Sequence, residues 1–280
     1  MSLIIENPQQ IIEETVEFLK QTYDKVGARK AVIAVSGGID SALSLSLLTK
    51  AVGPENIIPV FLPYKNQDMS DAKEICKWNK IAEEQWVEVA IDQTTDLLVS
   101  TIGIDSGDNL QTGGVDAHSG ENDDKFVAAN ENALRKGNVM ARIRMIVVYD
   151  IAKKNHALVC GTENKSENFL GYFTRFGDEA SDVEPILNFY KTQVRQLVEY
   201  LNLPSIFLDK KPSAGLWQDQ TDEQQFGFTY QEADQVLFQV FEQSVNKLDV
   251  VGVSPPTVEK VLEWVKAQDF KHHVPYKISD

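Results

Sequence analysis

The stretch "SGGIDS", residues 36–41, joins two apolar runs through two glycines, two serines and an aspartate. Glycines let a backbone turn sharply and bring its N–H groups close to a phosphate. The N-terminus of a following helix favours the same anion. Asp40 cannot bind an anion, but its carboxylate can hold Mg²⁺ against phosphate oxygens. We therefore expect a phosphate site here, although a plain strand-to-helix turn with a serine cap explains two adjacent glycines about equally well.

The loop differs from the common phosphate-binding motifs. It lacks the Gly-Lys-Ser/Thr ending of a Walker A loop and the spacing of GxGxxG. "SGGIDS" instead resembles the SGGxDS signature of the PP-loop ATP pyrophosphatases, which cleave ATP between its α and β phosphates. This resemblance implies ATP binding by Ala34, Val35, Ser36, Gly37, Gly38, Ile39, Asp40 and Ser41.

Five further stretches resemble, in order and spacing, the motifs of the NAD synthetases. They are "KGNVMARIRM" (136–145), "GTENKSE" (161–167), "GYFTRFGD" (171–178), "PILNFYKTQVRQL" (185–197) and "PSAGLWQDQTDE" (212–223). The resemblance runs from the N-terminal helix to about Pro275. It implies a C–N-forming ligase of NAD biosynthesis, which amidates deamido-NAD through an adenylate and releases AMP and pyrophosphate.

The resemblance also assigns the ATP side of the site. Thr162, Lys191 and Ser213 match nucleotide-contacting positions, and Lys191 supplies the cation that the glycine loop lacks. Asp40 and Glu167 match two Mg²⁺ ligands, with Mg²⁺ and ATP as cofactor and co-substrate. Without the resemblance, Glu167 is better explained as a solvated helix carboxylate.

The resemblance also assigns individual residues to the dinucleotide side of the site. The resemblance assigns contacts with deamido-NAD to Arg142, Arg175, Asp182 and Lys271. Arg175 stands where relatives often have lysine, and near Lys271 the family's histidine and arginine are replaced by Phe270 and His272. Asp178 would orient or deprotonate ammonia, but an ordinary loop aspartate explains it equally well. The expected catalytic residues are Asp178 and Lys191.

These residues need a scaffold of alternating strands and helices. Short apolar runs at 30–35, 56–63, 85–91 and 156–162 predict strands, and helical periodicity marks 7–23, 70–82 and 125–154. Strands that are apolar on both faces predict a doubly wound, mostly parallel α/β sheet flanked by helices.

We expect residues 1–280 to form a single synthetase domain without a glutaminase domain, so that free ammonia supplies the nitrogen. Two polar stretches, 103–124 and 210–227, are candidates to close over the adenylate.

Charge and composition exclude several classes of protein. The chain has 27 Lys and Arg against 42 Asp and Glu, a net charge of −15. Such an acidic surface argues against a nucleic-acid partner. No apolar run is long enough to span a bilayer, and Cys76 and Cys160 show no metal or disulfide pattern. We expect a cytoplasmic enzyme without a membrane partner. The resemblance implies a homodimer, for which the helices at 7–23 and 125–154 are candidate interfaces, although core packing explains them equally well.

Two other readings remain. A different PP-loop enzyme, such as a tRNA thiolase or a GMP-synthetase subunit, would share the first loop, but thiolation usually needs additional cysteines and a basic face. A non-catalytic nucleotide-binding module would also share the loop. Retention of Asp40, Glu167, Lys191 and Ser213 together speaks against it.

Overall fold

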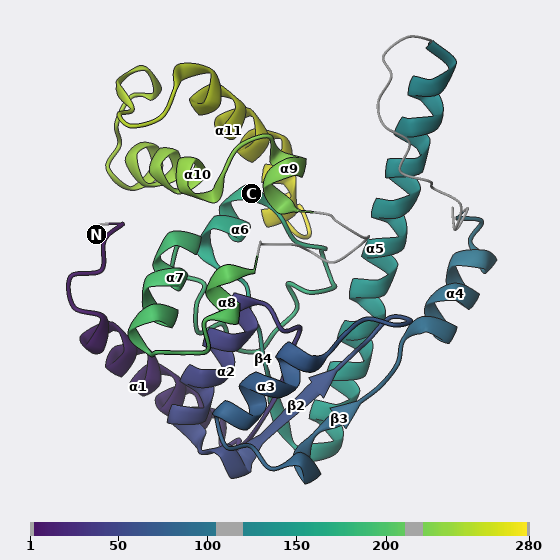
Figure 1. Ribbon diagram of the computed structural model, residues 1–280, viewed down its shortest axis with the longest axis vertical. Helices are drawn as coiled ribbons and strands as arrows, with labels where there is room; N and C mark the ends of the chain where they lie inside the picture. The colour runs from purple at the N-terminus through teal and green to yellow at the C-terminus, as the bar shows by residue number, and fades with distance from the viewer. Residues whose placement is uncertain (1–2, 105–119, 211–220, 279–280) are drawn as a thin grey trace.

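The computed structural model describes residues 3–104, 120–210 and 221–278, with only the backbone of 120–130. In this part of the chain four parallel strands form one sheet in the order β3-β2-β1-β4 (Figure 1). The strands are β1 (Lys30–Ala34), β2 (Ile57–Phe61), β3 (Val87–Glu88) and β4 (Ala157–Cys160). The predicted parallel α/β fold is therefore confirmed.

The third strand is shorter than its apolar run predicts. A 3₁₀ turn at Glu83–Gln85 takes up the start of the run, and only two residues pair with β2 as a ladder. The N–H groups of Val89 and Ile91 still donate to the carbonyls of Phe61 and Pro63, at 2.9 Å each. The segment therefore follows β2 beyond the regular strand, as an irregular sheet edge.

The helices surround the sheet and continue beyond it. They are α1 (Pro8–Val26), α2 (Ile39–Val52), α3 (Ser70–Trp78), α4 (Asp92–Thr101), α5 (Gly120–Asn155), α6 (Lys165–Leu170), α7 (Lys191–Tyr200), α8 (Ile206–Asp209), α9 (Asp222–Phe226), α10 (Tyr230–Leu237) and α11 (Pro255–Gln268). Asn7 caps α1 by accepting from the Gln10 N–H, as Asn-Pro predicts. The helix expected at 70–82 ends early because Lys80 adopts a left-handed φ of +59°, and the Ile81 N–H turns back to the Cys76 carbonyl at 3.0 Å.

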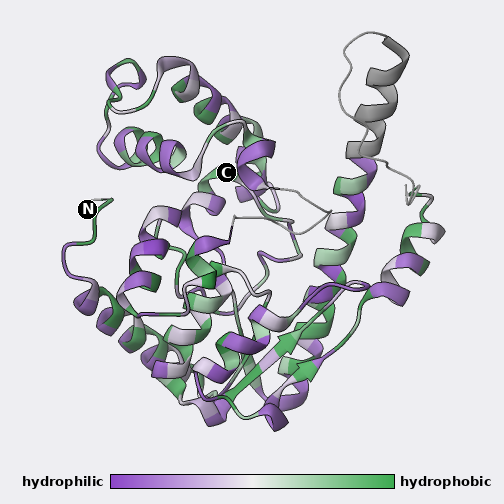
Figure 2. Cartoon of the chain, viewed as in Figure 1, coloured by the Kyte–Doolittle hydropathy of each residue, from purple (hydrophilic) through white to green (hydrophobic). Residues whose placement is uncertain are grey.

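Apolar residues on the two faces of β1 belong to two different cores. Ala31 and Ile33 pack with α1, α2, α3, α7 and α8, whereas Val32 packs with α5. Figure 2 shows the hydrophobic colour concentrated on the strands between these helical layers. The buried side of α1, with Leu19 fully buried, faces the first core, so its apolar stripe is core packing.

A third apolar cluster lies among α6, α9, α10 and α11. Leu170 and Val261 are fully buried in it, and Tyr190 joins it from the start of α7. In Figure 1 these helices lie beyond the end of the sheet from which β1 leads to α2 and β4 leads to α6. They form a helical cap over the carboxyl ends of the strands.

The direction of winding reverses between β1 and β4. The chain proceeds from β1 to β2 and β3 on one side, whereas β4 adds to the other side of β1. Open α/β sheets bind ligands at such a reversal, outside the carboxyl ends of the strands. The glycine loop after β1 and "GTENKSE" after β4 are therefore neighbours at the expected place.

The two cysteines are buried free thiols, and burial raises the pKa of Cys76 to about 12. Both thiols therefore belong to the apolar core. No helix among residues 3–104, 120–210 and 221–278 has the length and apolarity to cross a membrane.

Candidate active site

The glycine loop turns directly from β1 into α2. Gly37 has a φ of +78°, a left-handed conformation that favours glycine. The hydroxyl of Ser36 accepts from the Gly38 N–H at 3.2 Å, and the hydroxyl of Ser41 donates to the Gly38 carbonyl at 3.0 Å. Because Gly38 is the N-cap of α2, it offers no side chain to the first-turn N–H groups. Those groups suit an anion.

The loop after β4 begins a second helix at the same edge. Asn164 caps α6, accepting from the Glu167 N–H at 3.0 Å, and Glu167 returns a contact to the Asn164 N–H at 3.4 Å. The amide of Asn164 also donates to Asp40 Oδ1 at 2.9 Å. One side chain thus caps α6 and joins the two loops.

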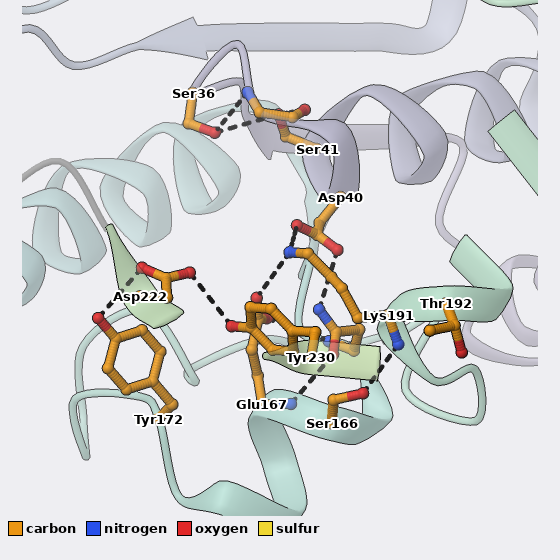
Figure 3. Close-up of polar contacts among 12 residues, drawn as sticks. Ser36, Asp40, Ser41, Ser166, Glu167, Tyr172, Lys191, Thr192, Asp222 and Tyr230 are labelled. Atoms are coloured by element: carbon orange, nitrogen blue, oxygen red, sulfur yellow. Dashed lines mark hydrogen bonds and ion pairs between the residues drawn. The ribbon is translucent and has the colours of Figure 1, made fainter. Parts of the chain in front are cut away.

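Lys191 connects the two carboxylates that the sequence assigns to a metal. Its Nζ lies 2.5 Å from Asp40 Oδ2 and 3.1 Å from Glu167 Oε1. Figure 3 shows the lysine reaching both carboxylates. The lysine side chain is 5% exposed, against 16% for Asp40 and 17% for Glu167. The sequence resemblance assigned Asp40 and Glu167 to Mg²⁺ and Lys191 to the nucleotide. The structure brings them together as one centre.

A layer of polar groups supports this lysine. The Lys191 ammonium lies 5.1 Å from the centroid of the Tyr230 ring. Asp222 accepts from the hydroxyls of Tyr230 and Tyr172, both at 3.1 Å (Figure 3). The backbone N–H of Lys191 donates to the Ser166 hydroxyl at 2.8 Å.

Burial and charge act against each other in this centre. Burial raises the pKa of Glu167 to about 8, opposed by Lys191 and reinforced by Asp40. Burial alone would lower the pKa of Lys191, but Asp40 and Glu167 outweigh it and raise that pKa. The lysine therefore stays charged.

The donor set fits Mg²⁺ bound jointly with a nucleotide. Asp40 and Glu167 come from different loops and converge on one atom, Lys191 Nζ. Mg²⁺ commonly takes one or two carboxylates and completes its shell with phosphate oxygens and water. In the described parts of the chain no cluster of three or more His, Cys, Asp and Glu could hold a metal alone. Two carboxylates beside a phosphate loop match the shared type of site.

Four of the residues assigned to the dinucleotide or to ammonia lie in the loop 171–178 or contact it. Arg142 Nε donates to the Arg175 carbonyl at 3.2 Å, and Lys271 Nζ donates to the Phe173 carbonyl at 2.9 Å. Asp178 accepts from the Thr174 N–H at 2.8 Å. The structure thus groups Arg142, Arg175, Asp178 and Lys271.

Asp182 is engaged elsewhere. Its Oδ2 accepts from the Val159 N–H in β4, at 2.8 Å. Thr162 lies half-buried in the loop after β4. Ser213 lies outside the described residues, as does most of the two stretches expected to close over the site, 103–124 and 210–227. Arg144, on the same helix as Arg142, donates from Nε to the Leu62 carbonyl at 3.1 Å.

A buried acidic pair at the end of β4 escaped the sequence reasoning. Glu184 lies so close to Gly161 that a Cβ there would be 1.7 Å from Oε1, and the Glu163 N–H donates to Glu184 at 3.2 Å. Burial, then the charge of Glu184, raises the pKa of Glu163 to about 9. Burial raises the pKa of Glu184 to about 7.

Other participants were also missed, for different reasons. The spacing "NKSE" is a capping-box pattern, which could have marked Asn164. Asp222 and Tyr230 lie 31 and 39 residues beyond Lys191, and no local signal joins them to it.

Comparison with known proteins relates this architecture to one family. The pattern that defines the NAD synthase family matches residues 11–275. An NH3-dependent NAD(+) synthetase from Fusobacterium nucleatum is 36% identical over 272 residues, covering 96% of this chain and 95% of the relative. A solved NMN synthetase from Francisella tularensis is 30% identical with a TM-score of 0.77, covering 98% of this chain and 99% of that one. An NH3-dependent NAD synthetase from Campylobacter jejuni gives a TM-score of 0.73 at 25% identity, covering 97% and 99% of the two chains.

Proposed function

The chain belongs to the NAD synthase family, and from that membership we propose that it amidates deamido-NAD to NAD with ATP and ammonia. One observation carries this function beyond the family match. Asp40, Glu167 and Lys191, drawn from three separate elements, meet beside a glycine loop at the winding reversal of the sheet. This arrangement supports the binding of an ATP phosphate group there.

The reaction needs ATP because a carboxylate is a poor acyl donor to an amine. The nicotinate carboxylate attacks the α-phosphate of ATP, a P–O bond to the β-phosphate breaks, and pyrophosphate leaves. Ammonia then attacks the acyl carbon, and AMP departs with one of the original carboxylate oxygens. The protein contributes positioning and neutralisation of the phosphate charge.

The ATP side is served by the loop 34–41, Thr162, Ser213 and Lys191. The first-turn N–H groups of α2 and the ammonium of Lys191, which pairs with Asp40 in that turn, would bind phosphate oxygens. Asp40 and Glu167 would hold Mg²⁺, which when bound supplies charge neutralisation for the phosphates. Their excess of negative charge over Lys191 favours a divalent cation.

The dinucleotide side is served by Arg142, Arg175, Asp182 and Lys271. Arg142 and Lys271 both donate to backbone carbonyls of the loop 171–178. These hydrogen bonds hold the two cations in positions where they would bind a phosphate. Asp178 lies in that loop, where it would orient ammonia or take its proton. Asp182 keeps Oδ1 for the substrate, while Oδ2 accepts from β4.

Residues 1–280 would act as one synthetase unit that uses free ammonia, and the substrates place it in the cytoplasm, where ATP is supplied. We expect a homodimer. Helices α4 and α5 pack on each other and expose large apolar side chains, including Leu97 at 71% and Ile146 at 61%. Light scattering should give twice the chain mass, and Ile146→Glu should shift it toward the single-chain mass.

Substrate profiling tests the function. The chain is incubated with ammonium, ATP and Mg²⁺ and with either deamido-NAD or nicotinate mononucleotide, and NAD, NMN, AMP and ADP are quantified. The second substrate is included because a relative of nearly equal length is an NMN synthetase. We expect NAD and AMP in equal amounts and a higher kcat/KM for deamido-NAD. A preference for the mononucleotide would move the chain to NMN synthesis, and absence of both amides would reject the function.

A further inference from the structure

A second lysine contacts the glycine loop at a different residue from Lys191. Lys210 follows α8, and its N–H closes the helix by donating to the Ile206 carbonyl at 3.1 Å. Its Nζ lies 2.7 Å from Asp71 Oδ2 and 3.4 Å from the Gly37 carbonyl oxygen. The Lys210 ammonium therefore contacts the glycine loop, although 173 positions separate Lys210 from Gly37.

The packing of Gly37 explains why this charge is needed there. A Cβ on Gly37 would lie 3.1 Å from both the Asp71 Cβ and the Ala72 nitrogen, so the loop is in close contact with the first turn of α3. That contact brings the Asp71 carboxylate beside a loop whose ligand is anionic. Without a cation, Asp71 would repel the phosphate. Lys210 neutralises it.

We propose that Lys210 binds the β- and γ-phosphate oxygens of ATP, and then the leaving pyrophosphate, as the second cation of the phosphate site; this rests on the function proposed above. Lys191 reaches the loop at Asp40 and Lys210 reaches it at Gly37, three residues earlier. A triphosphate lying along the loop meets a cation at each end. In a chain of net charge −15, such placed cations are the means of holding an anion.

The two lysines differ in how firmly they are held. Lys191 is 5% exposed between two carboxylates, whereas the Lys210 side chain is 51% exposed and pairs with one. An ion pair that open to solvent is weak. The ammonium has three N–H donors, so Lys210 can keep Asp71 and the Gly37 carbonyl and give one donor to a phosphate oxygen.

The competing explanation is a purely structural ion pair between α8 and α3. The two explanations differ in what Asp71→Asn does. If the pair only holds the helices together, Asp71→Asn and Lys210→Met have the same effect. If Lys210 binds phosphate, removing its charge weakens ATP binding, whereas removing Asp71 leaves the lysine in place and removes a repelling carboxylate.

The test measures binding by isothermal titration calorimetry for ATP, AMP and inorganic pyrophosphate. The variants are Lys210→Met, Lys210→Arg and Asp71→Asn, with Lys77→Met as matched control, because Lys77 is also paired on α3 but with Glu83, at 3.7 Å. Lys210→Met should weaken ATP and pyrophosphate about tenfold, which equals about 1.4 kcal/mol. AMP should be unaffected, since it lacks the β- and γ-phosphates. Lys210→Arg and Asp71→Asn should keep ATP affinity within about twofold of the unsubstituted chain, as should Lys77→Met.

Each contrary outcome has a definite meaning. Unchanged pyrophosphate affinity in Lys210→Met overturns the assignment, as does an equal loss in Asp71→Asn or an equal loss for AMP. Binding needs no turnover, so these results stand whether or not NAD is made. An unsubstituted chain that binds neither ATP nor pyrophosphate overturns this assignment and the proposed function together. One that makes NAD while Lys210→Met binds pyrophosphate normally overturns this assignment alone.

Discussion

Replacement of Lys191 by methionine tests the charged centre most severely. Methionine keeps most of the apolar stem and removes the ammonium, which lies 2.5 Å from Asp40 and 3.1 Å from Glu167. Two carboxylates then face each other without a counter-charge. Because the three side chains are 5–17% exposed, solvent screens this repulsion only weakly.

The size of the effect follows from distance and burial. At about 3 Å and an effective dielectric constant of about 20, each charge pair attracts by roughly 5 kcal/mol. Desolvation of the lysine offsets part of that, and removing one partner of a buried pair typically costs about 3–5 kcal/mol. We expect a loss of about 3 kcal/mol in the free energy of unfolding at pH 8.5.

The loss should depend on pH. In the folded protein burial raises the pKa of Glu167 from 4.5 to about 8, and Lys191 opposes that rise. Without the lysine the pKa rises further, so at pH 6 Glu167 is neutral without cost, whereas at pH 8.5 the folded protein must either ionise Glu167 beside Asp40 or hold its proton against the solvent. The loss should shrink to about 1–2 kcal/mol at pH 6, where Glu167 is neutral and only the lost lysine contacts remain.

Urea unfolding at pH 6 and pH 8.5, without nucleotide or metal, measures both values. The m-value should stay constant, so the midpoint reports stability. Lys247→Met is the matched control, because its pair with Glu259 is about half exposed and should contribute less than about 1 kcal/mol. Adding Glu167→Gln to Lys191→Met should recover part of the loss. Equal losses at the two pH values, or no loss, would refute the charge reasoning.

Three further substitutions probe the loop after β4. Glu163→Gln should leave the Tm unchanged at pH 5 and raise it at pH 9. The pKa of Glu163 is about 9 in the folded state, so the unsubstituted protein loses stability as pH rises from 4.5 to 9. A Tm difference that does not depend on pH would contradict this. Gly161→Ala should lower the free energy of unfolding in urea by about 2–3 kcal/mol. The new Cβ would lie 1.7 Å from Glu184 Oε1 and displace a hydrogen-bonded carboxylate. An unchanged midpoint would contradict that contact. Asn164→Ala should lower the free energy of unfolding by about 1–2 kcal/mol, because α6 loses its cap. It should also raise the KM for ATP, because the contact with Asp40 is lost. A KM equal to that of the unsubstituted chain would argue against the second effect.

The parallel sheet was predictable because its signals are local, whereas the strand order β3-β2-β1-β4 became known only from the structure. β-branched runs separated by helices predict parallel strands, and Asn7-Pro8 marks the start of α1 at the correct residue. Residues 92–101 carry no such signal. α4 there buries Thr95 and Val99 but exposes Leu97 and Leu98, so its helical period is blurred.

Contacts between distant residues were beyond the sequence. The residue type favoured metal binding by Asp40, and the family resemblance assigned Lys191 to phosphate. The two residues are 151 positions apart, and their ion pair follows from the packing of α7 on α2. The ring of Tyr230 beneath the lysine is set by the helical cap, which no local pattern positions.

The departures near the C-terminus have a structural counterpart. Phe270 stands where the family has histidine, and its ring lies 5.0 Å from the Arg175 guanidinium, itself in a position that is often lysine. A guanidinium stacks on an aromatic face better than an ammonium does. The two departures therefore fit each other, a match visible only once the fold brings 175 and 270 together.

Isotope transfer tests the central claim, that the substrate carboxylate attacks the α-phosphate at the centre formed by Asp40, Glu167 and Lys191. Deamido-NAD labelled with ¹⁸O in both carboxylate oxygens is converted with ATP, Mg²⁺ and ammonium, and the products are analysed by mass spectrometry. We predict one ¹⁸O in the phosphate of AMP, one in the amide of NAD and none in pyrophosphate. Label in inorganic phosphate together with ADP, or unlabelled AMP, would contradict the account.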